Sequence, residues 1–323
     1  MKNLVKKLVV LFFGSLLASC SKDEEAPSPA APISFVRLTS TTSMFAPVYE
    51  HSAVSFNGKL WIIGGRSGNT YRNEIWQTTN GTAWTPVTPV GPFFSVRAEH
   101  KVLVFNNKIW VIAGLSNGAA LNDVWSSADG INWVQETAAA AFSIRSGHDA
   151  VVFNNKMWVI GGIGIGGTKN DVWSSSDGIN WTQETTSGIF PIRAGHQAVV
   201  YNNKIFVIGG YDAGFKNDVW SSADGRTWTE EISSGARFIP RFAHQVVVYN
   251  SKLILSGGQD NAAFGSISNE IWSSTNGKDW TREPDAAFGK RAGHQAVVFN
   301  NKIFVTGGFN EADQPLGDAW LSN

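Results

Sequence analysis

Apolar and polar positions along the chain follow a repeated order of short blocks. Residues 196–210, HQAVVYNNKIFVIGG, form an apolar run, an Asn-Asn pair and a second apolar run. Asn tolerates positive φ, so the pair predicts a tight turn between two strands. Both faces of these strands are apolar, which is typical of strands covered on both sides. Stretches such as NDVWSSADGINW, residues 122–133, predict a second hairpin with its turn at Asp-Gly.

These blocks recur six times, every 48 to 50 residues, and each copy contains one of the six histidines, a pair of small residues and a tryptophan. The histidines are His51, His100, His148, His196, His244 and His294. The order of arginine, histidine, double glycine and spaced tryptophan resembles the kelch family of β-propellers over residues 33–323. The resemblance implies an all-β, six-bladed propeller of four-stranded blades. The Ser-x-Asp-Gly stretches are also similar to the Asp-box turns of sialidase-like propellers, but we interpret them as hairpin turns.

The last copy ends one strand short, and an unmatched stretch, ISFVRL, precedes the first histidine. Phe35 lies 16 residues before His51, as Trp84 lies 16 residues before His100. We therefore expect the N-terminal strand to complete the last blade, which closes the ring and removes an exposed sheet edge.

The N-terminus has the three-part pattern of an export signal: lysines, a short apolar run and small residues before Cys20. The run is too short to span a bilayer. LASC at 17–20 resembles a bacterial lipobox, which implies a signal peptide over 1–19 and lipidation of Cys20, the only cysteine. Residues 20–32, rich in charge and proline, predict a flexible linker.

The acidic residues behind Cys20 resemble the tag that sends some Gram-negative lipoproteins to the outer face of the outer membrane. We expect an exported, surface-exposed outer-membrane lipoprotein that contacts the membrane only through its anchor. The 26 basic and 26 acidic residues balance, so the broad basic surface of a nucleic-acid-binding protein is not expected.

Loops that follow each double glycine and loops that lead into each inner strand vary in length and composition, which favours recognition on that face of the scaffold. The candidate contacts there include Arg66, Tyr71, Tyr211 and Asp212, together with Arg72, Lys216, Gln259, Asp260, Phe309, Asn310 and Glu311.

Five arginines lie three residues before a histidine: Arg97, Arg145, Arg193, Arg241 and Arg291. Some kelch domains that bind acidic peptides use arginines at this motif position, so these five are candidate ligand-binding residues with a planar fork for carboxylate, sulfate or phosphate. The alternative, which we favour, is that each arginine holds a recurring acid of its own blade: Asp123, Asp171, Asp218, Asp318, Glu74 or Glu270.

Two other repeated positions favour a structural interpretation. The histidines lie around a wide channel rather than converging on one point, so we expect structural hydrogen bonds, no metal site and no cofactor. Six phenylalanines recur once per blade and are predicted to be core wedges between blades: Phe45, Phe94, Phe142, Phe190, Phe238 and Phe288.

Three functions remain open from the sequence. The leading hypothesis is a non-catalytic, surface-tethered module that binds a glycan or an extracellular protein on its loop-rich face. The second is a sugar isomerase similar to kelch-type sialic-acid mutarotases, with Glu50 or Glu99 as acid/base residue, although no local motif marks a catalytic carboxylate. A copper oxidase similar to galactose oxidase is disfavoured because Cys20 serves the anchor. The third is a structural subunit of a cell-surface assembly.

Overall fold

The structure is a computed structural model that describes residues 32–39, 44–184, 189–233, 235–260 and 266–323. The expected signal peptide, Cys20 and nearly all of the linker lie outside these ranges. Residues Pro32–Asn323 form one compact unit. Every regular element in the described ranges is a β-strand. Within those same ranges, no helix has the length and apolar character needed to cross a membrane.

Most strands belong to antiparallel sheets of four. One sheet has β2 (Ser52–Phe56), β3 (Lys59–Ser67), β4 (Thr70–Thr78) and β5 (Thr85–Val87). Another has β15 (Gln197–Tyr201), β16 (Lys204–Tyr211), β17 (Phe215–Ser222) and β18 (Thr229–Glu230). A third has β20 (Gln245–Tyr249), β21 (Lys252–Ser256), β23 (Ile271–Ser274) and β24 (Thr281–Glu283). A fourth has β25 (Gln295–Phe299), β26 (Lys302–Thr306), β27 (Ala319–Ser322) and β1 (Phe35–Arg37).

The remaining strands form a nine-stranded sheet and a short pair. The nine-stranded sheet contains β6 (Lys101–Phe105), β7 (Lys108–Ser116), β8 (Ala119–Ser127) and β9 (Val134–Thr137). It also contains β11 (Asp149–Phe153), β12 (Lys156–Gly164), β13 (Gly167–Ser175) and β14 (Thr182–Gln183). The two-residue strand β10 (Arg145–Ser146) joins these two groups by pairing with both β8 and β12. The short pair is β19 (Arg241–Phe242) with β22 (Gln259–Asp260).

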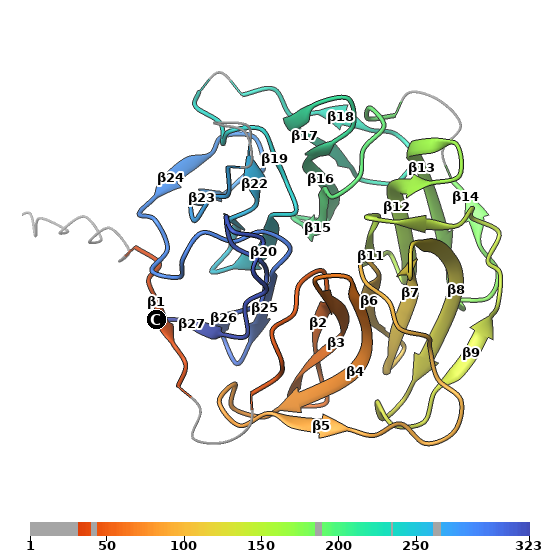
Figure 1. The fold of residues 1–323 in the computed structure, drawn as a ribbon. Coiled ribbons are helices and arrows are strands. Elements are labelled where there is room, and N and C mark those ends of the chain that lie inside the picture. Colours follow the sequence, from red (N-terminus) through yellow and green to blue (C-terminus); the bar gives the residue numbers. More distant parts are fainter. Residues whose placement is uncertain (1–31, 40–43, 185–188, 234, 261–265) are drawn as a thin grey trace, which may run out of the picture. The chain divides into compact units, whose positions relative to one another are not determined.

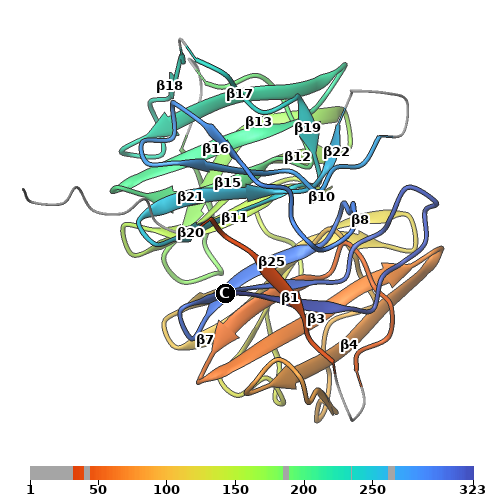
Figure 2. The same ribbon diagram turned by 90° about the vertical axis from the view of Figure 1, so that its left-hand side faces the viewer.

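The sheets have a propeller-like arrangement around a common centre, with the first strand of each group innermost (Figure 1). Along the chain, β2, β6, β11, β15, β20 and β25 each contact the next of these strands, and β25 also contacts β2. Figure 2 shows neighbouring sheets stacked face against face, as in β12–β13 and β15–β17. This stacking explains why both faces of the inner strands are apolar in the sequence.

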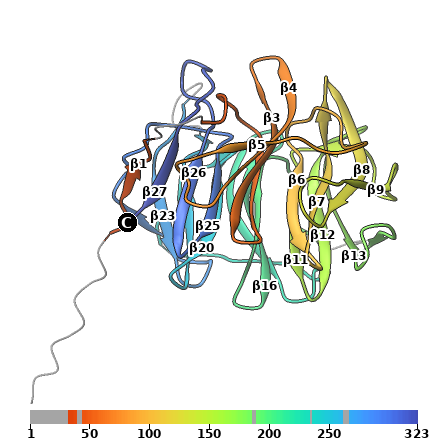
Figure 3. The ribbon, with the colours of Figure 1, turned by 90° about the horizontal axis from the view of Figure 1, so that it is seen from below.

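The first strand of the compact unit pairs with the last one. Phe35 of β1 lies opposite Ser322 of β27 in an antiparallel register, and Figure 3 shows the two strands side by side at the C-terminus. The Phe35 ring contacts Phe288 edge-on, with 4.9 Å between ring centroids. In the preceding groups a tryptophan occupies this place, as in the pair of Phe238 and Trp280 at 5.3 Å. The matching sequence distances of Phe35 and Trp84 therefore correspond to matching packing.

The predicted phenylalanine wedges are confirmed as core residues: five of them are 0 % exposed and Phe45 is 3 % exposed. Phe94, for example, packs at 4.9 Å against Trp133 of its own group and in one apolar cluster with Ile63 of the preceding sheet. Edge-to-face aromatic contacts of this kind add to the energy of burial alone. The wedges thus join adjacent sheets.

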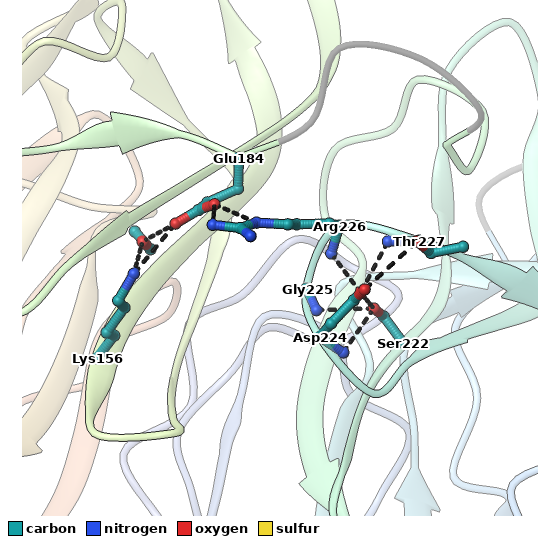
Figure 4. Close-up of polar contacts among 8 residues, drawn as sticks. Lys156, Glu184, Ser222, Asp224, Gly225, Arg226 and Thr227 are labelled. Carbon is teal, nitrogen blue, oxygen red and sulfur yellow. Dashed lines mark hydrogen bonds and ion pairs between the residues drawn. The ribbon is translucent and has the colours of Figure 1, made fainter.

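The Asp-Gly turns are hairpin turns, as predicted, and they also connect neighbouring sheets (Figure 4). In one of them, Asp224 accepts hydrogen bonds from the backbone N–H groups of Arg226 and Thr227 at 2.8 Å. Gly225 has φ +74°, and a Cβ there would lie 2.2 Å from the Trp158 ring of the preceding sheet, so no larger residue fits. Across the same boundary, Arg226 donates to Glu184 at 2.6 Å.

Candidate functional site

The repeated histidines and the repeated glycines pack against one another between neighbouring sheets. Each histidine is buried. A Cβ on Gly64 would lie 2.7 Å from Cε1 of His100 in the next group, so the first glycine of the pair leaves room for that ring. Nε2 of His51 lies 3.0 Å from the Thr306 hydroxyl oxygen, and Nε2 of His294 lies 3.1 Å from that of Ser256. The predicted structural hydrogen bonding is therefore confirmed for these two histidines.

The five repeated arginines are buried inside the sheets, which confirms the favoured alternative of ion pairing within each group and corrects their candidate role as ligand-binding residues. Arg193 is 0 % exposed and binds both carboxylate oxygens of Asp218, at 2.8 and 2.7 Å, and the Gly209 carbonyl at 2.8 Å. The other four form the corresponding ion pairs: Arg97 with Asp123, Arg145 with Asp171, Arg241 with Glu270 and Arg291 with Asp318. Since each of these guanidinium groups already binds an acid of its own group, none of the five remains available to a ligand.

The first group departs from this arrangement because Val48 stands where the others have arginine. Its acid, Glu74, is instead paired with Arg72 at 3.2 Å and is largely exposed. The predicted contact Arg72 therefore belongs to the framework of its own sheet.

A continuous ring of backbone hydrogen bonds surrounds the centre of the unit. We call it the axial ring; it consists of the residues directly before the six histidines, Glu50, Glu99, Gly147, Gly195, Ala243 and Gly293. Each N–H donates to the carbonyl of the preceding member over 2.8 to 3.3 Å, and the Glu50 N–H completes the circle by donating to Gly293. All six residues have positive φ, between 52° and 60°. Glycine suits this conformation, whereas Glu50 and Glu99 adopt it at an energetic cost.

The residues directly after the histidines form a second layer, which we call the inner layer. It consists of Ser52, Lys101, Asp149, Gln197, Gln245 and Gln295. Asp149 holds Lys101 in an ion pair at 3.2 Å and also accepts from the backbone N–H of Ala198 at 2.6 Å. Gln245 is 6 % exposed, and its amide has no hydrogen-bond partner among the described residues. Charged side chains thus occupy one side of this layer and amides the other.

The axial ring and four residues of the inner layer line an axial cavity of about 120 Å³. Besides the ring residues and Lys101, its lining includes the three glutamines of the inner layer, Tyr211 and Phe242. The Phe242 ring lies against Gly195, where a Cβ would be only 3.0 Å away. Its centroid is 4.8 Å from that of Tyr211 and 5.0 Å from that of Phe215. The cavity therefore combines aromatic, amide and carboxylate groups, the mixture that fixes small ligands in protein pockets.

The two glutamates of the axial ring have different environments. Glu50 receives two hydrogen bonds from Arg66, at 2.5 and 3.0 Å, and the Arg66 guanidinium lies 4.8 Å from the centroid of the Tyr49 ring. Glu99 receives a hydrogen bond from Ser146 but forms no ion pair within the described residues. Burial raises the pKa of Glu99 to about 7, and the nearby charge of Glu50 adds to the rise. Glu99 is therefore a carboxyl group that titrates near neutral pH.

The other predicted loop contacts divide into those at the cavity and those away from it. Tyr211 lines the cavity, and Arg66 acts on it by holding Glu50. Tyr71 on β4 pairs in register with Arg66 on β3, and Tyr71 lies outside the cavity lining. Asp212 is also outside it, and hydrogen bonds from Thr168 and the Ala213 backbone lower the pKa of Asp212. The cavity thus unites Tyr211 with the two glutamates that were candidate acid/base residues.

Sequence reasoning missed Phe242 and the glutamines of the inner layer. A signal for the glutamines was present, because each lies directly after a repeated histidine, where an inner strand begins. No comparable signal marked Phe242, which lies on the two-residue strand β19 with its ring against Gly195.

Comparison with protein families agrees with the repeat pattern. The KLHDC2/KLHL20/DRC7 Kelch-repeats domain matches residues 129–258, and the Kelch motif matches residues 47–77 and 290–321. No curated protein matches the chain significantly. Residues 129–258 and 290–321 contain the buried arginine, histidine and double glycine described above, and residues 47–77 contain the histidine and double glycine with Val48 at the arginine position. The chain therefore carries kelch repeats in these segments.

Proposed function

We propose that the protein is a non-catalytic binding module that takes a glycan or part of an extracellular protein into its axial cavity. In this proposal the repeats form a six-bladed propeller closed by β1, and Cys20 tethers it to the outer face of a bacterial outer membrane. The circular chain of backbone hydrogen bonds and the pairing of β1 with β27 support the closed ring. Kelch propellers typically mediate protein–protein binding, which supports a binding role.

The unpartnered amide of Gln245 at the cavity wall is the observation that carries this proposal. Its nitrogen and oxygen are not among the fully enclosed side-chain atoms that lack a partner, so they reach the cavity and are open to hydrogen bonds with a ligand. Phe242 offers an apolar face beside this amide, and sugars present both hydroxyl groups and an apolar C–H face. The cavity is thus suited to a sugar unit.

Saturation-transfer NMR on the purified protein with neutral and acidic sugars, including sialic acid, tests the proposal. We expect transfer from at least one sugar and its loss in Gln245→Ala. The matched control is Gln135→Ala, which changes an exposed glutamine on β9, outside the cavity lining. Equal transfer in both variants would contradict a site in the axial cavity.

One observation favours the second candidate, a mutarotase-like isomerase. A pKa near 7 suits Glu99 for donating and accepting protons at neutral pH. The same spectra follow the interconversion of sugar anomers, beginning from freshly dissolved crystalline sugar. Interconversion accelerated by the protein and slowed by Glu99→Gln would replace the binding function with the catalytic one.

The third candidate, a structural subunit, requires a broad apolar outer surface. Val90 and Ile131 form one exposed apolar pair, joined by a backbone hydrogen bond of 3.0 Å. The other large exposed apolar side chains among the described residues are Val36, Val134, Ile165, Ile179, Ile192 and Ile232. The axial cavity is the more specific feature.

A further inference from the structure

The charges around the axial cavity do not cancel. Arg66 is neutralised by Glu50, with two hydrogen bonds between them. Lys101 is neutralised by Asp149 at 3.2 Å. Glu99 is left without a cation of its own among the described residues, although it lines the cavity. An occupant with one positive charge would balance this site.

Two aromatic residues of the cavity lining restrict the kind of cation. Tyr211 is close enough for the Glu99 charge to raise the pKa of its hydroxyl, in addition to the larger effect of burial. Phe242 packs on Tyr211 with 4.8 Å between centroids. Aromatic faces attract organic ammonium groups and also pack against the C–H face of a sugar ring. Both properties favour an organic amine.

The amide side of the cavity restricts the cation further. Gln197 and Gln245 are 7 % and 6 % exposed, and Gln295 lines the cavity beside them. Gln197 forms only a long hydrogen bond of 3.4 Å to the His196 carbonyl, and Gln245 forms none within the described residues. A simple alkylamine offers these cavity-lining amides no hydroxyl group, whereas a polyhydroxylated amine offers them both donors and acceptors.

We propose that the axial cavity recognises a hexosamine with a free amino group. The ammonium group binds Glu99, the sugar hydroxyls bind Gln197, Gln245 and Gln295, and the apolar face of the ring packs on Phe242. This inference rests on the proposed function, because it names the ligand class of the same cavity.

Isothermal titration calorimetry at pH 7.0 with four probes tests the inference: glucosamine, N-acetylglucosamine, glucose and Nα-acetyl-lysine amide. We expect glucosamine to bind at least tenfold more tightly than each of the others. N-acetylglucosamine and glucose lack the positive charge, and the lysine derivative lacks the hydroxyl groups. Glu99→Gln should abolish the preference for glucosamine over glucose.

The matched control is Glu230→Gln, which removes the same charge from an exposed glutamate on β18, outside the cavity lining. It should keep the full preference. A thermal melt of Glu99→Gln, expected at or above the melting temperature of the parent protein, separates lost recognition from lost folding.

Each contrary result has its own meaning. Equal binding of all three sugars, or a preference that survives Glu99→Gln, overturns the amine inference and leaves the cavity as a sugar site. Tighter binding of the lysine derivative than of glucosamine overturns the hexosamine in favour of a lysine side chain from a protein ligand. Binding of none of the four probes overturns the inference together with the glycan form of the proposed function.

Discussion

Arg193 and Glu99 represent two regions of the molecule that differ in whether a charged side chain has an ion-pair partner. Arg193 belongs to a position repeated in five groups, is completely buried, and has its guanidinium filled by Asp218 and a backbone carbonyl. Glu99 stands at a position occupied by glycine or alanine in four groups, and it has no ion-pair partner within the described residues. The difference teaches that residues repeated around the ring hold the sheets together, whereas departures from the repeat mark the site.

The backbone supports the same distinction. Glu50 and Glu99 have φ values of 53° and 54°, in the left-handed region where Gly147, Gly195 and Gly293 carry no Cβ penalty. A non-glycine residue held there costs of the order of 1 kcal/mol, and such strain is often found at binding sites. Two glutamates at strained positions beside a cavity are therefore better explained by recognition than by stability.

Removal of residues 33–39 should have the largest effect on the framework. It deletes β1, exposes the edge of β27 and removes the Phe35 ring from Phe288. We expect loss of soluble monomer, measured by size-exclusion chromatography and thermal melting. The control is Val36→Ala, which changes a 56 % exposed side chain of the same strand. An unchanged melting temperature after the deletion would contradict closure by β1.

Acid should weaken the framework through its histidines. Burial lowers the pKa of His51 and of His244 to about 3, below the ordinary value of 6.5. The unfolded chain therefore binds more protons than the folded one between pH 6.5 and 3, so stability falls as the pH falls through this range. Each of these two histidines should lower the free energy of unfolding by about 1.4 kcal/mol for each unit by which the pH falls. Urea unfolding at pH 7.5, 6.5 and 5.5 measures this, and a flat profile would refute it.

Arg193→Met should destabilise the fold without changing ligand binding. It leaves the Asp218 carboxylate, whose side chain is 21 % exposed, without its cation. Breaking a buried pair in this way costs about 3 kcal/mol. Arg226→Met is the matched control: this side chain is 62 % exposed, and Glu184 keeps Lys156, so we expect a loss of at most about 1 kcal/mol. Equal losses in urea unfolding would remove the distinction between framework and surface arginines.

Much of the fold was predictable because its signals are local and repeated. The Asn-Asn and Asp-Gly turns, the apolar runs and the phenylalanine wedges each depend on a few neighbouring residues. The apolar runs and the wedges recur in every group, and the two turns recur in several of them. The partner of β1 was predictable from the spacing of Phe35 alone, because that residue takes the place of a tryptophan. The signal peptide and the lipidation of Cys20 remain predictions.

The candidate site was less predictable because it depends on side-chain direction and charge balance. The arginine motif left two directions open for the guanidinium, the axis or an acid of its own group; the recurring acids favoured the second, and burial decides for it. Glu50 and Glu99 were predicted as alternative acid/base residues, but the sequence did not show that Arg66 pairs with Glu50. That pairing, made through a strand hairpin, is what leaves Glu99 as the unbalanced charge.

The smallest expected effect is a gain in stability on Glu99→Gln. The folded pKa of Glu99, about 7, lies above the ordinary value of 4.5, so the folded state holds a proton that the unfolded chain releases between these values. Burial of the ionised carboxylate therefore destabilises the fold above pH 7, and this cost disappears below pH 4.5. We expect the substitution to stabilise the protein by about 1 to 2 kcal/mol at pH 8 and by almost nothing at pH 4, because partial solvent exposure reduces the full shift. Urea unfolding of both proteins at the two pH values measures the difference. A loss of stability at pH 8 would make Glu99 a framework residue like Arg193. A gain in stability at pH 8, accompanied by weaker ligand binding, would show that this carboxylate serves ligand binding and destabilises the fold.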